Sequence, residues 1–371
     1  MSISRVPVRL GPDPYPVYIG AGILRSLPAL LSRRVSSRRC VIVTDRNLRR
    51  GIAARAASAL RGAGWKVDVA ALPAGERAKS LASLSGLYRF LLRGRAERMT
   101  PIIAVGGGTV GDAAGFAAAT YYRGVPLVHV PTTLLAQVDS AIGGKTAVNH
   151  PLAKNAVGAF YQPILVVADL DTLRSLPERE FRSGLAETVK YGLVFDRAFS
   201  RKLLTRWDRI LERDPRELGG VVRRCVELKA GVVARDERDL SGRRELLNFG
   251  HTVGHALEAA TGYRSFRHGE AVAWGMRAAT LISEGRGWLR PREGRKTVWS
   301  LLDRLSGPDW PGRLSRARLL KPLALDKKVR EKKNVFVLLK DLARPVRVGD
   351  VTRVEIESAV AKLSAPPGRR R

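Results

Sequence analysis

The feature that most constrains the fold is a series of short β-branched and aliphatic runs in the first half of the chain. Their starts lie roughly 25 to 40 residues apart, and helix-like patterns fill the intervals. The runs lie at residues 40–44, 67–72, 102–105, 127–130 and 164–167. Continuous apolar runs of this length are typical of strands that are buried on both faces. The pattern predicts an α/β fold with a parallel sheet.

The second half of the chain has a different pattern. After about residue 176, longer stretches carry apolar residues at three- and four-residue spacing, as in amphipathic helices; examples are residues 199–211, 218–233 and 271–282. Pro177 suits the first turn of a helix. We therefore expect a parallel-sheet domain over residues 1–176, a mostly α-helical domain over residues 177–363, and a frayed basic tail over residues 364–371.

Composition narrows the class of protein. A chain of 371 residues exceeds what one hydrophobic core usually organises, and 45% hydrophobic with 27% charged residues excludes a disordered or collagen-like chain. The longest run of small and apolar residues, 113–122, is about half of a bilayer span. The amino terminus lacks the apolar segment of a secretory signal, and two cysteines give no disulfide framework. We expect a cytoplasmic protein with no membrane partner.

The formal net charge of +32 raises the question of nucleic-acid binding. The excess arginines are spread over several stretches, with neither an RNP-like aromatic run nor zinc-finger spacing among them. We therefore expect no dedicated nucleic-acid partner, and we expect part of the charge to serve anionic ligands. A basic nucleic-acid-binding protein stays as the alternative to an enzyme.

A glycine-rich segment directly follows the run at residues 102–105. The stretch from Gly106 to Gly111 satisfies G-x-G-x-x-G, in which glycines let the backbone approach a pyrophosphate at a helix amino terminus. Thr132, Thr133 and Asp45 also lie at the ends of predicted strands, where they can bond the hydroxyls or phosphates of a nucleotide. We interpret the set as a dinucleotide site in a Rossmann-like domain; the alternative is a tight turn without a ligand.

The segment at residues 139–149 is rich in glycine and lysine but lacks the G-x-x-x-x-G-K-[ST] spacing of a phosphate loop, so we do not expect a nucleoside triphosphatase. With Lys145, and with Lys154 and Asn155 shortly after it, the segment suits a polyhydroxylated anionic substrate. The alternative is a solvated surface loop.

Three of the five histidines cluster at His251, His255 and His268. The first two are four residues apart and share a helical face, and the third begins an amphipathic run. Imidazoles from adjacent helices with one carboxylate form a three-ligand divalent metal site with an open position for substrate. Three buried core imidazoles are the alternative. The candidate carboxylates are Glu187, Glu258 and Glu270. The first of them stands three residues before Lys190, as in an ordinary helical ion pair.

Together these motifs resemble the 3-dehydroquinate synthase family of sugar phosphate cyclases, over about residues 40 to 340. The segments that carry the resemblance are residues 106–112, 122–124, 131–133, 139–145, 186–190, 247–255 and 268–270. The resemblance implies an NAD-binding α/β domain, a helical metal-binding domain, a sugar phosphate substrate and a homodimer. It implies a lyase of the shikimate pathway that converts 3-deoxy-D-arabino-heptulosonate 7-phosphate to 3-dehydroquinate and phosphate. Transient oxidation by NAD, phosphate elimination, re-reduction and aldol cyclisation are the stages of that reaction.

The resemblance also implies roles for individual residues. The ligands of a zinc or cobalt ion would be Glu187, His251 and His268, while His255 would contact substrate or relay a proton. The nucleotide contacts would be Asp45, Glu76, Lys79, Gly108, Thr109, Val110, Gly111, Asp112, Thr132, Thr133, Lys145, Lys154, Thr172, Leu173, Arg174 and Ser175. The substrate contacts would be Asp139, Lys145, Asn155, Lys190, Lys229, Arg244, Asn248 and His255. Arg123 of the partner subunit would reach the substrate phosphate, and either Lys327 or Lys328 would also contact the substrate.

The chain departs from the family pattern at two places. One extra residue between Lys229 and His251 leaves Arg243 as an alternative to Arg244, and Asp239 stands where a glutamate is usual. The rival activities are those of another sugar phosphate cyclase, such as 2-deoxy-scyllo-inosose synthase, and of a metal-dependent polyol dehydrogenase that releases NADH. The residues at 244, 248 and 255 argue against a valiolone synthase.

Overall fold

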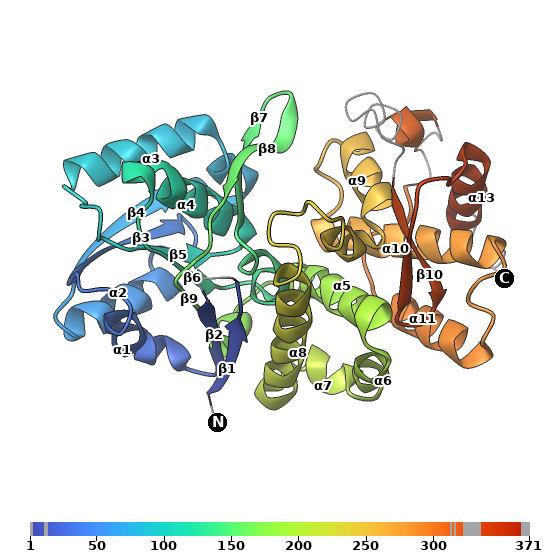
Figure 1. Ribbon diagram of the computed structural model, residues 1–371, viewed down its shortest axis with the longest axis horizontal. Helices are drawn as coiled ribbons and strands as arrows, with labels where there is room; N and C mark the ends of the chain where they lie inside the picture. The colour runs from blue at the N-terminus through green and yellow to red at the C-terminus, as the bar shows by residue number, and fades with distance from the viewer. Residues whose placement is uncertain (1–2, 11–13, 312–313, 315–316, 322–334, 365–371) are drawn as a thin grey trace. The chain divides into compact units, whose positions relative to one another are not determined.

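The chain forms two compact units in the computed structural model, which describes residues 3–10, 14–311, 314, 317–321 and 335–364 (Figure 1). The first unit consists of Met1–Leu176 and Ile210–Arg238, and the second of Pro177–Arg209 and Asp239–Arg371. The first break coincides with the boundary expected after residue 176. The segment 210–238, expected in the helical domain, lies in the first unit because its long helix packs against the sheet there. Of the expected tail, all but Ser364 lies outside the described residues.

A seven-stranded sheet forms the centre of the first unit, with the strand order β1-β2-β9-β6-β5-β3-β4. The five predicted runs are β3 (Arg39–Asp45), β4 (Lys66–Leu72), β5 (Ile102–Gly106), β6 (Leu127–Pro131) and β9 (Leu165–Asp169). They pair in parallel, which confirms the predicted sheet. At the edge, β1 (Ser4–Val8) runs antiparallel to β2 (Tyr15–Gly20), which is itself parallel to β9.

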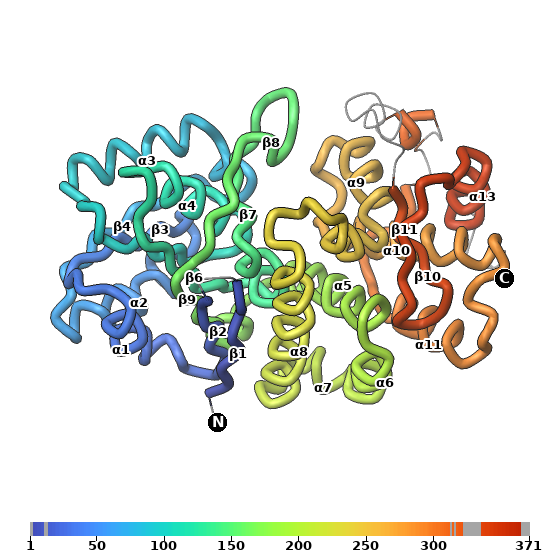
Figure 2. Tube along the Cα trace, viewed as in Figure 1, coloured from blue at the N-terminus to red at the C-terminus, as the bar shows by residue number. Residues whose placement is uncertain are grey.

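Helices cover both faces of this sheet, as the tube in Figure 2 traces. On one face α1 (Leu27–Ser32) and α2 (Ile52–Gly62) pack against the side chains of Ile42 and Ile103. On the other face α3 (Leu81–Arg93) and α4 (Gly108–Thr120) pack against Val41 and Ile102. Alternate residues of each strand therefore enter different cores, which explains why most positions of the runs are apolar.

Helix α8 (Pro215–Val233) and a hairpin complete the first unit. The carboxylate of Asp214 caps α8 by accepting hydrogen bonds from the backbone amides of Arg216 and Glu217 at 2.8 and 3.0 Å. The helix contacts β1 and β2. The hairpin consists of β7 (Lys145–His150) and β8 (Ala153–Phe160), in a segment for which the sequence predicted substrate contacts but no strands. Short helical turns are η1 (Ile23–Ser26), η2 (Gly75–Ala78), η3 (Tyr121–Arg123), η4 (Ala136–Ser140) and η5 (Leu170–Leu173).

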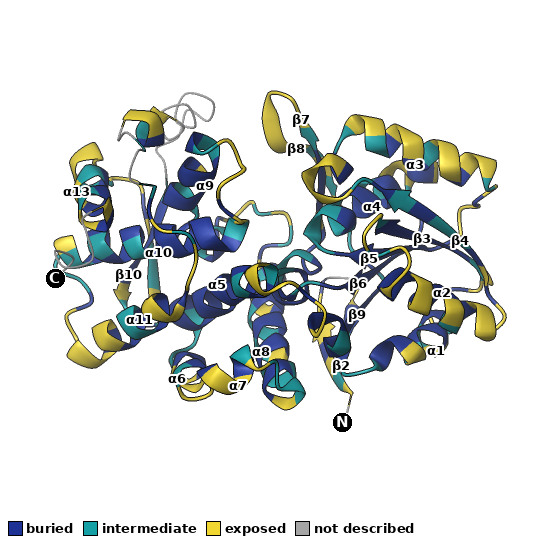
Figure 3. Cartoon of the chain, turned by 180° about the vertical axis from the view of Figure 1, so that it is seen from behind, coloured by how far each residue is buried: buried dark blue, intermediate teal, exposed yellow. Residues whose placement is uncertain are grey.

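The second unit is mostly helical, as predicted. Its helices are α5 (Glu178–Phe195), α6 (Arg197–Thr205), α9 (His251–Ala260), α10 (His268–Gly285), α11 (Arg292–Arg304) and α13 (Arg353–Ser364), and α7 (Trp207–Leu211) joins it to the first unit. The unit also contains the turn η6 (Arg244–Asn248) and the hairpin of β10 (Phe336–Asp341) and β11 (Arg344–Val348). Figure 3 shows that α5 and α10 are largely buried. None of the helices in the described ranges is long and apolar enough to cross a membrane.

One buried histidine of β6 gives the first testable prediction. His129 is 6% exposed, and burial lowers its pKa to about 4. The unfolded chain, with an ordinary histidine pKa, therefore binds a proton between about pH 6.5 and 4 that the folded protein does not bind. Stability falls over this range as the pH is lowered, by about 3 kcal/mol at full effect. We expect His129→Gln to lose less stability than the wild type between pH 7 and 4.5 in denaturant titrations. Equal losses in the two proteins would contradict the assignment.

Candidate active site

Three helices of the second unit bring the predicted metal ligands together. Glu187 lies in the middle of α5, His251 begins α9 and His268 begins α10. Glu187 Oε1 is 3.6 Å from His251 Nε2 and 3.5 Å from His268 Nε2, and one donor atom of each residue lies within 4.8 Å of the others. Two ligands of a tetrahedral zinc ion, each about 2.1 Å from the metal, are about 3.4 Å apart. The donor set and its spacing therefore fit one divalent cation.

Two glycines of α10 permit this close approach. A Cβ atom at Gly269 would lie 1.9 Å from the carbonyl oxygen of Ser183 in α5. A Cβ atom at Gly275 would lie 1.8 Å from the carbonyl oxygen of Gly250, immediately before α9. Because backbone atoms cannot move aside as a flexible side chain can, only glycine allows α10 to lie this close to both neighbours.

Burial and neighbouring charges together set the electrostatics of the cluster. Glu187 is fully buried and forms an ion pair with Lys190, which is 1% exposed. Burial and the charge of Lys190 hold the pKa of His251 well below its usual value, so this imidazole is neutral. Burial also disfavours a charge on His268, but the hydrogen bonds and charges of Glu187 and Glu258 outweigh it and raise the pKa of His268 to about 10. A cation that binds through His268 therefore displaces a proton.

The structure gives the three candidate carboxylates different surroundings. Only Glu187 faces the Nε2 atoms of both His251 and His268. Glu258 Oε2 lies 3.3 Å from the other ring nitrogen of His268, Nδ1. Glu270 accepts hydrogen bonds at 2.6 and 2.8 Å from Arg179 and at 2.7 Å from the backbone amide before α10. The carboxylate of Glu270 therefore holds the start of α10.

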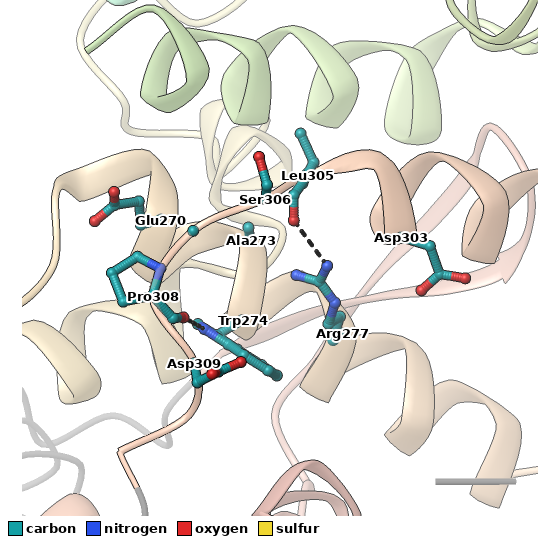
Figure 4. Close-up of a pocket in the computed structure, with 10 residues that line it drawn as sticks. Glu270, Ala273, Trp274, Arg277, Asp303, Leu305, Ser306, Pro308 and Asp309 are labelled. Atoms are coloured by element: carbon teal, nitrogen blue, oxygen red, sulfur yellow. Dashed lines mark hydrogen bonds between the residues drawn. The ribbon is translucent and has the colours of Figure 1, made fainter. Parts of the chain in front are cut away.

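Glu270 also lines a hollow of about 230 Å³ on the side of α10 that Figure 4 shows. There Trp274 Nε1 donates a hydrogen bond of 3.0 Å to the carbonyl oxygen of Pro308, and Arg277 donates to that of Leu305 at 3.0 Å. Apart from the candidate carboxylate Glu270, none of the metal or substrate residues predicted within the described ranges lines this hollow. We therefore place the candidate active site at the histidine cluster.

In the first unit the glycine turn has the geometry expected of an anion site. Gly106 ends β5, and the first turn of α4, all of it described, carries no acidic side chain. The backbone amide of Thr132, after β6, donates to Gly106 O at 3.0 Å. A Cβ atom at Gly106 would lie 2.7 Å from the side chain of Val110, which explains the glycine. The amides that begin α4 are thus available to a pyrophosphate at the carboxyl edge of the sheet.

A polar cluster lies beside α4. Lys79 Nζ is 2.5 Å from Asp112 Oδ2 and also donates to Asn155 Oδ1. Burial raises the pKa of Asp112, although the Lys79 charge opposes the shift. Asn149, which the sequence analysis did not single out, donates to Glu76 Oε2 at 2.7 Å and accepts from the amide of Asn155 at 3.2 Å. Its position in β7, six residues before Asn155, became informative only once the hairpin was known.

A second ion pair joins two predicted substrate contacts. Lys229 Nζ in α8 lies 2.6 Å from Asp139 Oδ1 and donates to the Asp139 carbonyl at 2.7 Å. Both residues belong to the first unit. An anionic ligand at this lysine would therefore compete with Asp139.

Several predicted nucleotide contacts already have partners within the fold. Asp45 Oδ1 accepts from the amides of Asn47 and Leu48 at 2.8 and 3.1 Å. The Thr133 hydroxyl accepts from the Ala136 amide, and the Thr172 hydroxyl donates to the Asp169 carbonyl. The fully buried residues Val110 and Leu173 can offer only backbone atoms. Those with exposed or partly exposed side chains are Asp45, Glu76, Thr109, Asp112, Thr133, Lys145, Lys154, Arg174 and Ser175.

The remaining predicted substrate contacts differ in exposure. In η6, Arg244 is buried whereas Arg243 and Asn248 are exposed. His255 is the exposed member of the histidine cluster, with its ring centroid 5.2 Å from that of His251. Arg123 is exposed and has a left-handed φ of 61°. Lys327 and Lys328 lie outside the described residues.

Comparison with known proteins decides the family. Residues 69–183 match the profile described as 3-dehydroquinate synthase N-terminal, and residues 184–329 match the one described as 3-dehydroquinate synthase C-terminal. The chain belongs to the 3-dehydroquinate synthase family. A 3-dehydroquinate synthase of Desulforamulus reducens is 42% identical over 97% of this chain and 100% of its own length. One of Symbiobacterium thermophilum is 46% identical over 93% of this chain and 94% of its own.

Solved structures of related cyclases share the fold of this 3-dehydroquinate synthase family member. A 2-deoxy-scyllo-inosose synthase complexed with carbaglucose-6-phosphate, NAD+ and Co2+ has a TM-score of 0.87 at 27% identity, with coverage of 96% of this chain and 99% of that one. A 2-epi-5-epi-valiolone synthase from Streptomyces hygroscopicus subsp. jinggangensis with NAD+ and Zn2+ bound has a TM-score of 0.83 at 30% identity, with coverage of 94% and 96%. A glycerol dehydrogenase at 16% identity shares the fold alone.

Proposed function

We propose that this chain is a 3-dehydroquinate synthase, which converts 3-deoxy-D-arabino-heptulosonate 7-phosphate to 3-dehydroquinate and phosphate. The observation that carries the proposal is the identity of 42% to 46% with relatives of that name over nearly the whole chain, against 27% and 30% with the inosose and valiolone synthases. The convergence of Glu187, His251 and His268 supports it.

We propose NAD and one divalent cation, zinc or cobalt, as the cofactors. NAD supplies a hydride acceptor that is restored within each turnover, and the cation supplies a charge that acidifies substrate hydroxyls. The amides at the start of α4 would hold the pyrophosphate of the dinucleotide. Glu187, His251 and His268 would hold the cation; their nitrogen and oxygen donors suit either metal.

Lysine and histidine side chains near the metal ligands would control protons and charge. Lys190 neutralises part of the charge of Glu187 and, being buried, can present a proton donor without bulk water around it. His255 lies beside His251 but is exposed, so it can exchange a proton with a bound substrate and then with solvent. We assign it that relay role and not a place among the ligands.

The anionic ends of the substrate need cationic partners. We propose that Lys145, Lys229, Arg244 and Arg123 supply them, with Asp139, Asn155 and Asn248 binding hydroxyls. Holding one flexible substrate in a single conformer lowers the entropic barrier to the intramolecular aldol step, so few dedicated acids and bases are needed.

The deciding experiment follows inorganic phosphate and NADH together. The purified protein is incubated with the heptulosonate phosphate, a divalent metal and NAD in less than stoichiometric amount. We expect phosphate to be released in molar excess over NAD while no NADH accumulates, because the cofactor is recycled. Glucose 6-phosphate is the matched substrate control, and we expect no phosphate release from it.

The same assay distinguishes the rival functions. Stoichiometric NADH without phosphate would support a polyol dehydrogenase. Release of phosphate from glucose 6-phosphate would support an inosose synthase. Inactivity together with salt-sensitive retention of DNA would support a basic nucleic-acid-binding protein.

We further propose that the active protein is a homodimer, in which Arg123 reaches the substrate of the partner subunit. Light scattering gives the mass in solution. The test mixes the Arg123→Ala variant with a second inactive variant. Recovery of activity in the mixed dimers would support the shared site, because one intact site is then assembled from two chains.

A further inference from the structure

The two imidazoles of the proposed metal site are held in different ways. His251 Nδ1 lies 3.4 Å from the carbonyl oxygen of Phe249, a neutral acceptor. His268 Nδ1 lies 3.3 Å from Glu258 Oε2, a carboxylate that is 8% exposed. In both rings Nε2 is the atom that faces Glu187. Each Nδ1 atom thus has an acceptor, and each Nε2 atom is directed to the cation position.

The position of Glu258 follows from the helix that carries it. It stands three residues after His255 and seven after His251 in α9, so all three side chains share one face of that helix. This face packs against α10, where His268 begins the helix. The contact between Glu258 and His268 is therefore set by the packing of two rigid elements and not by a loop.

Glu258 has an alternative role as a metal ligand. Donor atoms of His255, Glu258 and His268 also lie within 4.8 Å of one another. The His268 atom that faces Glu258 is Nδ1, so a cation shared by these two residues would take Nδ1, which cannot carry a proton and bind a cation at the same time. Only the cluster with Glu187 leaves Nδ1 free to donate to Glu258 while Nε2 binds the metal.

We propose that Glu258 is a positioning residue, which fixes the orientation and the Nδ1–H tautomer of His268 so that Nε2 binds the cation. The inference rests on the metal site of the proposed function. A carboxylate behind a histidine ligand also increases the basicity of the ring, and removing such a partner typically weakens metal binding by roughly 10- to 100-fold.

The experiment measures cobalt affinity by competition with a chromophoric chelator, and it records the visible absorption spectrum of the bound cobalt. Glu258→Gln is compared with the wild type and with Glu187→Gln, which removes a proposed ligand. Glu284→Gln is the matched control, because it also removes one negative charge. Glu284 lies in α10 and accepts hydrogen bonds from Arg295 and Trp299. That position lies 16 residues beyond His268, roughly 24 Å along the helix.

We expect Glu258→Gln to bind cobalt roughly 10- to 100-fold more weakly than the wild type with a spectrum of the same shape, and Glu284→Gln to be unchanged. Glu187→Gln is expected to lose more affinity and to change the spectrum. Glu258→Asp serves as the second variant if glutamine impairs folding, and we expect it to bind with intermediate affinity.

Two results would overturn the inference while leaving the proposed function intact. Wild-type affinity in Glu258→Gln would show that His268 needs no carboxylate behind it, and a spectrum altered as in Glu187→Gln would show that Glu258 is itself a ligand. A wild-type protein that binds no cobalt or zinc would instead overturn the metal site of the proposed function, and the inference with it.

Discussion

Replacing His268 with alanine is expected to abolish turnover and to lower the metal content of the purified protein, whereas His255→Ala slows turnover and leaves the metal content near normal. His268 Nε2 faces Glu187 together with His251, so its loss leaves only two donors. His255 lies beside His251 but is exposed, and the donor cluster that includes it is formed with Glu258 and His268. We expect a drop in metal affinity for His268→Ala beyond the roughly 10- to 100-fold typical of losing an outer partner.

Metal content per chain, measured by atomic emission after dialysis, checks this pair of variants. Phosphate release under saturating metal gives the second readout, because added metal cannot restore a ligand that is gone. An equal loss of metal in the two variants would show that the ligands have been assigned wrongly.

Replacing Gly275 with alanine is expected to destabilise the protein by about 3 kcal/mol or more. The added Cβ atom would lie 1.8 Å from Gly250 O, so α10 has to move away from the chain that begins α9. Overpacking of an interior usually costs about 1 to 3 kcal/mol, and a clash with backbone lies at the upper end. Since His251 begins α9 and His268 begins α10, the same movement separates two metal ligands and weakens metal binding.

Gly285, at the end of the same helix, is the matched control. No atom lies within 4 Å of a Cβ built there, so Gly285→Ala is expected to leave stability unchanged or to raise it by up to about 1 kcal/mol. Denaturant unfolding followed by circular dichroism measures both variants. Wild-type stability in Gly275→Ala would mean that α9 and α10 do not pack as closely as described.

The parallel strands were predictable from sequence because most of their positions are β-branched or aliphatic, with few polar residues such as Asp68 and His129 among them. The strands β3, β4, β5, β6 and β9 match the five runs to within a few residues. The edge pair β1 and β2 has no such signal, since Pro7 and Pro16 interrupt it and lie opposite each other. The hairpin of β7 and β8 was not predicted, because lysines and other polar residues conceal its alternation and its segment was interpreted only as a source of substrate contacts. Its strands have exposed positions that need no apolar residue.

The candidate site was predictable where chemistry depends on rare residue types. Five histidines in a chain of this length make the trio conspicuous, and helical spacing places His251 and His255 on one face. Spacing alone left the choice between Glu187, Glu258 and Glu270 open, because all three stand near helix faces that can meet the histidines. The packing of the helices determines the surroundings of the three carboxylates. That packing depends on glycines such as Gly269 and Gly275, whose role cannot be seen in a pattern of hydrophobic residues.

The segment Ile210–Arg238 returns the chain to the first unit, so the chain crosses between the units three times. A fragment that ends at Leu176 is therefore not expected to fold as the first unit does, because it lacks α8, the helix that contacts β1 and β2. Conversely, a protease that nicks the backbone near residue 176 would leave two pieces that stay associated through α8. Co-expression of the two halves as separate polypeptides is thus a natural route to a split version of this protein.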